Sequence, residues 1–239
     1  RAVIVGGGFI GIEMAEALAD MWEVDTTVVE YFSQIMPGFV GPQFARMAQR
    51  QMEQHGVRFF LDEEVQAIEG TDTVKAVVTN KRRLEADLVI IAIGAAPNVE
   101  LARAAGLRIG PTGAIVVDEH MRTSDPAIYS GGDCAEIRNL VTGQPGYYPL
   151  GSMSNRQGRV IGTNLAGGSA VFKGAVGSFV IKTFEAALAG TGLSLESARR
   201  AGFDAVSVQV AQLDRAHFYP DKAMVHLELV VERTSRRIL

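Results

Sequence analysis

Apolar runs and amphipathic segments alternate over the first 61 residues of the chain. Residues 2–5, 26–29 and 57–61 are short apolar runs, which are typical of buried strands. Residues 14–18 and 42–55 instead place apolar side chains at helical spacing. This β-α-β-α-β order predicts half of a doubly wound α/β fold, with a parallel sheet of the Rossmann type.

The hydrophobic period changes after these elements. Short segments at 65–68, 74–79 and 83–85, separated by turn residues, predict an antiparallel β-meander attached to the parallel sheet. The continuous apolar run at 88–93 predicts a buried central strand. Further helices are expected at 99–105, 152–166 and 194–201, and further strands at 114–117, 127–130, 179–184, 206–213 and 224–232. Glycines 158 and 162 predict close packing of the helix that contains them.

The composition of the chain limits which classes of function are possible, and it leaves the predicted fold unchanged. The chain has 239 residues, 47% of them hydrophobic, which is normal for a globular protein with a substantial core. The net charge of −4 gives no reason to expect nucleic acid or an anionic membrane as a partner. We expect no membrane span and no signal peptide. The single cysteine, Cys134, excludes an internal disulfide and suits a reducing compartment such as the cytoplasm.

Both ends of the chain fall within or close to predicted strands. Residue 2 already belongs to the first apolar run, and the strand expected at 224–232 lies seven residues from the last residue. We therefore expect this chain to be part of a longer protein.

The first apolar run leads into a Gly-x-Gly-x-x-Gly motif made by Gly6, Gly8 and Gly11. In a dinucleotide-binding unit the first glycine allows the turn, the second admits a pyrophosphate and the third lets the helix pack against the strand. Glu30 ends the second strand, 19 residues after Gly11, where a carboxylate meets the ribose hydroxyls of NAD. Glu30 would repel a 2′-phosphate, which predicts a preference for NADH over NADPH. A structural glycine turn remains the alternative.

Two later loops could also contact a ligand. Gly94 and Pro97 follow the strand expected at 88–93, at the sheet edge where open α/β folds bind ligands. An ordinary turn is the alternative there. Gly131, Gly132 and Asp133 follow the strand expected at 127–130 and could bring a carboxylate to a ligand. For Asp133 the alternative is a simple capping role.

Taken together, these segments resemble the pyridine nucleotide-disulfide oxidoreductases, in the branch of coenzyme A disulfide reductase, NADH oxidase and NADH peroxidase. Residues 3–16 resemble the opening of that branch's NAD domain, residues 127–136 its second flavin motif, and residues 155–167 the following helix. Residues 182–193 and 217–220 resemble its dimerisation domain. The resemblance covers essentially the whole chain.

On the nicotinamide side, the resemblance adds four positions to the glycine motif. Phe9 would be the aromatic ring that shields the flavin until nicotinamide displaces it, and the neighbouring Ile10 would contact NAD. Glu13 would lie beside the nicotinamide, although a solvated helix acid is the simpler interpretation. Gly94 would line the nicotinamide pocket.

On the flavin side, the resemblance assigns Gly132 and Asp133 to FAD, with Asp133 bonded to the ribityl chain. Gly151 and Ser152 would begin a helix whose N-terminus points at the flavin and stabilises negative charge on it. Tyr219 corresponds to a tyrosine that reaches the partner subunit's active site and contacts substrate. An ordinary interface tyrosine remains at least as good an interpretation of Tyr219.

The resemblance divides the chain into an NAD(H)-binding domain at 1–100, the C-terminal part of an FAD-binding domain at 101–170, and part of an α+β dimerisation domain at 171–239. The N-terminal FAD-binding half and the redox cysteine of such proteins have no counterpart here, so we expect no catalytic residue in this chain. Cys134 lies inside the flavin motif and does not replace that cysteine.

The expected function is the NAD(H)-binding portion of an FAD-dependent oxidoreductase. The whole protein would pass hydride from NADH to flavin and on to a disulfide, a peroxide or oxygen, as a cytoplasmic homodimer with a small-molecule substrate and no metal site. An inactive NAD-binding module, or part of a ferredoxin- or rubredoxin-type reductase, are the alternatives.

Overall fold

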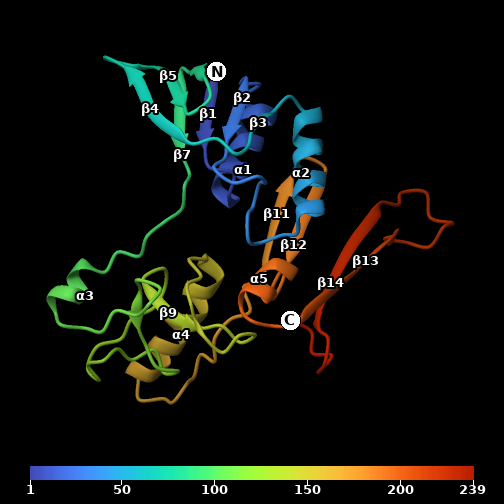
Figure 1. Cartoon of the computed structure of the whole chain (residues 1–239). Coiled ribbons are helices and arrows are strands. Elements are labelled where there is room, and N and C mark those ends of the chain that lie inside the picture. Colours follow the sequence, from blue (N-terminus) through green and yellow to red (C-terminus); the bar gives the residue numbers. More distant parts are fainter.

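A computed structural model describes all residues, 1–239, and shows two lobes joined by an extended connection at 92–98 (Figure 1). We call residues 1–91 the first lobe and residues 99–176 the second lobe. The chain then returns to the first lobe as the hairpin of β11 (Phe179–Thr183) and β12 (Ala186–Gly190). The hairpin of β13 (Ala205–Leu213) and β14 (Met224–Glu232) projects to one side of the molecule (Figure 1). No helix combines the length and the apolar character needed to cross a bilayer.

A four-stranded parallel sheet forms the centre of the first lobe, in the order β3-β2-β1-β7. Its strands are β1 (Ala2–Val5), β2 (Thr26–Val29), β3 (Arg58–Phe60) and β7 (Leu88–Ile91). β1 pairs in parallel with both β2 and β7, so the strand order reverses at β1. The expected doubly wound half is confirmed.

Helices cover one face of this sheet. They are α1 (Phe9–Glu16), which continues as a π-helical turn at Ala17–Met21, and α2 (Pro42–Gln54). Ile4, Ile12, Val28 and Met52 are fully buried in the core between the helices and the sheet. The helix expected at 42–55 is confirmed, and a proline at its first position and a glycine after its end favour these bounds.

The β-meander covers the opposite face. It consists of β4 (Val65–Gly70), β5 (Val74–Thr79) and β6 (Arg83–Glu85), paired as an antiparallel sheet. Val3 and Val29, which alternate with the helix-facing Ile4 and Val28, pack there against Val77. The strands β1 and β2 therefore bury both of their faces, and the predicted meander is confirmed.

The prediction of a buried central strand at 88–93 is wrong in one respect. β7 forms the edge of the parallel sheet, and the side chains of Leu88 and Ile91 are 43% and 62% exposed. A continuous apolar run indicates that both faces become covered, but the sequence does not say which strand lies at the edge.

The second lobe contains α3 (Glu100–Ala104), β8 (Ile115–Val116), β9 (Ala135–Arg138), β10 (Pro145–Gly146) and α4 (Gly151–Leu165). The prediction of a strand at 127–130 is wrong. The β-pairing of this segment is limited to one isolated bridge, between Tyr129 and Arg122. Thr123 and Asp125 turn this segment by bonding their side chains to nearby backbone amides. The regular strand, β9, begins only after Asp133.

The long helix α4 confirms the element expected at 152–166, but not its expected packing. A Cβ atom added at Gly158 or Gly162 would meet no atom of this chain within 4 Å. The buried face of α4 is formed instead by Met153, Val160 and Ile161. The two glycines therefore leave an open helix face rather than a close helix contact.

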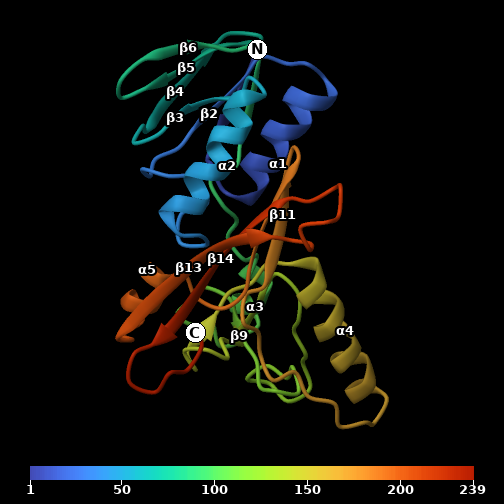
Figure 2. The ribbon, with the colours of Figure 1, turned by 90° about the vertical axis from the view of Figure 1, so that its right-hand side faces the viewer.

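The C-terminal segment contributes β11 (Phe179–Thr183), β12 (Ala186–Gly190), α5 (Leu195–Arg200), β13 (Ala205–Leu213) and β14 (Met224–Glu232). Figure 2 shows β11 running beside α1, and Ile181 and Phe184 join the core of the first lobe. The sequence did not predict β12, which completes this hairpin. Ser194 caps α5 by accepting a hydrogen bond from the Ser197 amide.

Candidate functional site

The glycine turn between β1 and α1 has no room for side chains at two of its positions. Gly6 adopts a φ of +106°, and a Cβ there would overlap the carbonyl oxygen of Ala92. A Cβ at Gly11 would overlap the carbonyl oxygen of Gly6. The strand, the turn and the helix are therefore in backbone contact, as the motif predicts.

Gly8 differs from these two glycines because its surroundings are open. No atom lies within 4 Å of a Cβ added there, and no side chain caps α1. The first hydrogen bond of the helix runs from the Ile12 amide to the Gly8 carbonyl, at 3.0 Å. The amides of residues 8–11 have no acceptor within the chain. Free amides and an open approach at a helix N-terminus are suited to a phosphate.

Glu30 lies directly behind this turn and is 95% buried. Its carboxylate accepts hydrogen bonds from the Gly7 amide at 2.6 Å and from the Phe32 amide at 2.8 Å. Each carboxylate oxygen has two lone-pair positions, so each retains one acceptor site. The fold thus fixes the orientation of Glu30 beside the glycine turn before any ribose is present.

The other residues expected on the nicotinamide side surround the same turn. The ring of Phe9 packs edge-on against Phe39 and Phe179, with centroid separations of 4.5 and 5.0 Å. Ile10 is 58% exposed. The side chain of Glu13 is exposed and makes no hydrogen bond or ion pair.

Gly94 lies in the connection that leaves the edge strand β7. It adopts a φ of +112°, and no atom lies within 4 Å of an added Cβ. It is two residues beyond Ala92, whose carbonyl faces Gly6. The structure therefore places Gly94 at the same edge of the sheet as the glycine turn.

The loop at Gly131, Gly132 and Asp133 is held from the side by α4. Gly132 adopts a φ of +82°, and its amide donates to Gln157 Oε1 at 2.6 Å. Ser154 Oγ donates to Asp133 Oδ1 at 3.1 Å, which leaves Asp133 Oδ2 without a bond in the chain. Asp133 is exposed, so its carboxylate can accept a hydrogen bond from a ligand hydroxyl.

The start of α4 and the Tyr147 phenol lie near Asp133 and contribute to the electrostatics of this loop. Gly151 and Ser152 begin α4 and are exposed, and no side chain caps this helix N-terminus. Burial, followed by the nearby Asp133 and Cys134, raises the pKa of the Tyr147 phenol. The Cys134 sulfur lies 3.5 Å from Gly131 O, within the loop itself.

Sequence reasoning missed Gln157 and Ser154, which position this loop. The sequence contains a signal for Gln157. Gln157 and Asn164 share one helical face with the apolar residues Met153, Val160 and Ile161. Gln157 is 99% buried and Asn164 is 92% buried at that apolar face. Buried amides on an apolar stripe indicate polar partners on the neighbouring segment.

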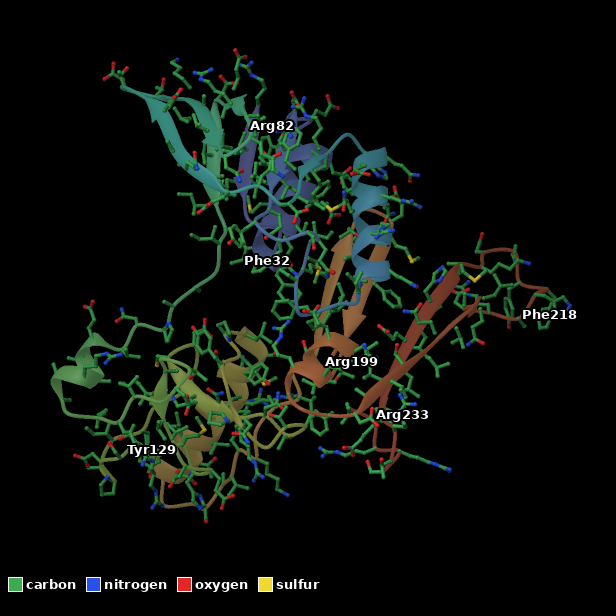
Figure 3. The ribbon with its side chains drawn as sticks, in the orientation of Figure 1. Phe32, Arg82, Tyr129, Arg199, Phe218 and Arg233 are labelled. Carbon is green, nitrogen blue, oxygen red and sulfur yellow. The ribbon has the colours of Figure 1, made fainter.

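The structure does not bring Tyr219 to either loop. Tyr219 lies in the turn of the β13–β14 hairpin, stacked on Phe218 with a centroid separation of 5.0 Å. Figure 3 shows the labelled Phe218 at the far end of the hairpin, well away from Phe32. Any role for Tyr219 near a dinucleotide would therefore involve a second molecule.

Comparison with known proteins decides the family. The model of the pyridine nucleotide-disulphide oxidoreductases matches residues 1–155, which include both the glycine turn and the Asp133 loop. The chain belongs to this family. The resemblance to this family is thereby confirmed.

Relatives of this chain are similar over its full length. An NAD(P)H sulfur oxidoreductase (CoA-dependent) of Pyrococcus abyssi is 38% identical over 99% of the chain and 53% of its own length. The solved structure of an FAD-dependent pyridine nucleotide-disulphide oxidoreductase from Desulfovibrio vulgaris is 55% identical, with a TM-score of 0.92, and is matched over 57% of its length. An NAD-dependent persulfide reductase from A. fulgidus is 42% identical, with a TM-score of 0.96, over all of this chain and 44% of its own. The chain spans about half the length of the relatives it matches.

Proposed function

We propose that this chain is the NAD(H)-binding part of an FAD-dependent oxidoreductase that moves reducing equivalents from NADH to a sulfur–sulfur bond. The observation that carries the proposal is the pairing of two sites in one chain. The glycine turn has free amides beside a fixed Glu30, and a separate loop presents the exposed carboxylate of Asp133. Peroxide or oxygen is the second candidate acceptor, and a 36% identical relative from Methanocaldococcus jannaschii, an NADH oxidase, favours oxygen of these two.

In this proposal the pyrophosphate of NADH lies over Gly8 and bonds the free amides of residues 8–11. Glu30 accepts the adenosine ribose hydroxyls with its two remaining lone pairs, and it disfavours the 2′-phosphate of NADPH. Ile10, Glu13 and Gly94 lie toward the nicotinamide, with Phe9 as the ring that yields to it. Support comes from the open Gly8 and from the orientation that the fold imposes on Glu30.

The flavin would be held on this chain by Gly132 and Asp133 and by the start of α4 at Gly151 and Ser152. When bound, FAD would supply the redox chemistry, which is to accept hydride from NADH and to pass on its electrons. Gln157 and Ser154 hold the loop so that Asp133 can accept a ribityl hydroxyl, and the α4 N-terminus favours negative charge nearby. The free oxygen of Asp133 and the uncapped helix start fit this role.

The organisation of the whole protein follows the same proposal. Residues 1–100 form the NAD(H)-binding domain, 101–170 part of the FAD-binding domain, and 171–239 part of a dimerisation domain. The exposed apolar side chains of Val208, Leu227 and Leu229 on the β13–β14 hairpin support a homodimer, in which Tyr219 would approach the partner subunit's substrate. We propose a cytoplasmic location, in line with the single unpaired cysteine.

The proposal is tested by titrating the chain with NADH and NADPH while recording nucleotide fluorescence, and by recording its visible absorption spectrum. Saturable NADH binding that is tighter than NADPH binding is expected. Absence of NADH binding would refute the proposal. Flavin absorption bands in the purified chain would show that it retains FAD, whereas NADH binding without them favours an NAD-binding module with no turnover of its own.

A further inference from the structure

The segment that follows Glu30 touches the glycine turn directly. We call residues 31–41 the nucleotide loop. The Met36 amide donates to the Gly7 carbonyl at 2.8 Å, and the Phe32 amide donates to Glu30 Oε1 at 2.8 Å. Ile35 and Met36 are fully buried. A displacement of the nucleotide loop would therefore disturb both Gly7 and Glu30.

The nucleotide loop has a backbone that needs external support. Met36 adopts a φ of +48°, which is uncommon for a residue with a side chain. Gly38 follows with a φ of +81°, and Gln34 Nε2 closes the loop by donating to Val40 O at 3.1 Å. Such conformations persist where surrounding structure holds them in place. The remaining contacts of the loop show which structure does so.

Helix α5, more than 150 residues later in the chain, holds the tip of the nucleotide loop. Ser197 Oγ donates to the Gly38 carbonyl at 2.9 Å, and Ser194 Oγ lies 3.5 Å from the same oxygen. Figure 1 shows the loop before α2 reaching down to α5. Both hydroxyls are partly buried, so their bonds are shielded from competition with water.

Two further contacts come from the same C-terminal segment. The ring of Phe39 lies 6.0 Å from that of Phe179, at the start of β11. A Cβ added at Gly41 would lie 3.0 Å from Glu228 Oε2 on β14. Elements from three parts of the C-terminal segment therefore contact the nucleotide loop, and α5 supplies its direct hydrogen bond.

We propose that Ser197 is a positioning residue of the dinucleotide site. By holding the Gly38 carbonyl it fixes the nucleotide loop, and through the loop it fixes the Gly7 carbonyl and the Glu30 carboxylate. Ser197 itself touches no nucleotide. The inference rests on the proposed function, and it connects the proposed dimerisation domain to the affinity of the NAD site.

The test uses two variants of the full chain. Ser197→Ala removes the closer hydroxyl, and Ser194→Gly combined with Ser197→Ala removes both, at little cost to the cap because glycine is also a good N-cap residue. Loss of one such hydrogen bond should weaken NADH binding about two- to tenfold. The binding of ADP-ribose should weaken by the same factor, because the affected contacts lie on the adenosine half of the dinucleotide. Hydrogen exchange of the Met36 amide should accelerate relative to amides in β1, which report global opening.

Two control variants separate positioning from general destabilisation. Ser178→Ala removes a hydroxyl pair with Thr191, at 2.7 Å, in the same C-terminal segment, and should change neither binding nor Met36 exchange. Ser197→Thr keeps the donor and should retain the affinity. Unchanged NADH affinity in the double variant, with normal binding by the unaltered chain, would overturn this inference alone. An unaltered chain that binds no NADH would overturn the proposed function together with it.

Discussion

Replacing Gly8 with alanine should separate nucleotide binding from folding. Gly8 has a φ of −77° and a ψ of −170°, extended values that alanine adopts without strain. No atom lies within 4 Å of the new methyl group. The expected loss of stability is that of a less favourable N-cap, at most about 1 kcal/mol. For a chain of this size that lowers Tm by roughly 2–4 °C.

The effect on binding should be much larger, because the new methyl group stands where the pyrophosphate would approach. The amides of residues 8–11 are free, and a hydrogen bond from such an amide to a charged group contributes about 1.5–3 kcal/mol. Loss of one such bond weakens NADH binding roughly tenfold to a hundredfold. Gly8→Ala should therefore bind NADH poorly while it remains folded.

NADH fluorescence titration and thermal unfolding measure the two effects on the same sample. Gly11→Ala is the matched variant, since its methyl group would overlap the Gly6 carbonyl oxygen. It should lose about 1–3 kcal/mol through overpacking, partly offset by the better helix propensity of alanine. A Gly8→Ala variant that binds NADH as tightly as the unaltered chain would refute the placement of the pyrophosphate.

Three further variants test other parts of the chain. Glu30→Gln should reduce the preference for NADH over NADPH about tenfold, because it removes the charge facing the 2′ position; an unchanged ratio of dissociation constants would contradict this. A backbone bond to Gln51, and then the nearby Glu185, raise the pKa of His55, so its stabilising contribution is complete below about pH 6.5 and is lost as pH rises through the folded-state pKa. The Tm difference between the unaltered chain and His55→Gln should therefore shrink from pH 5.5 to pH 8, and a constant difference would exclude the charged pair. Asn164→Ala removes three partly buried hydrogen bonds at the end of α4 and should cost about 2–4 kcal/mol without affecting NADH affinity, as chemical denaturation and titration would show.

Much of the fold could be predicted because its signals are local. The first lobe follows from apolar runs and helical spacing that involve only neighbouring residues. The same reasoning failed at 127–130, where an apolar pattern is overridden by the side-chain turns of Thr123 and Asp125. It also failed for the exposure of β7, since a position at the sheet edge depends on which strands pair across the whole lobe.

The residues of the site also fall into those that local signals predict and those that depend on the whole fold. The close contact of Gly11 could be predicted because it involves Gly6, a few positions earlier, whereas the contact of Gly6 is with Ala92, far along the chain. Gln157 acts on Gly132 from 25 positions later in the chain, and Ser197 acts on Gly38 from 159 positions later. No spacing rule connects such pairs, because the fold alone brings them together.

The packing of β11 has a consequence for how the chain is made. Every other buried member of the main core lies between residues 4 and 57, yet Ile181 and Phe184 complete it. Because synthesis proceeds from the N-terminus, the apolar surface of α1 and α2 remains uncovered until most of the chain has left the ribosome. Closing so distant a contact is also entropically slow. The nascent first lobe therefore passes through a stage in which an apolar face of α1 and α2 is exposed, and this stage ends when the β11–β12 hairpin docks.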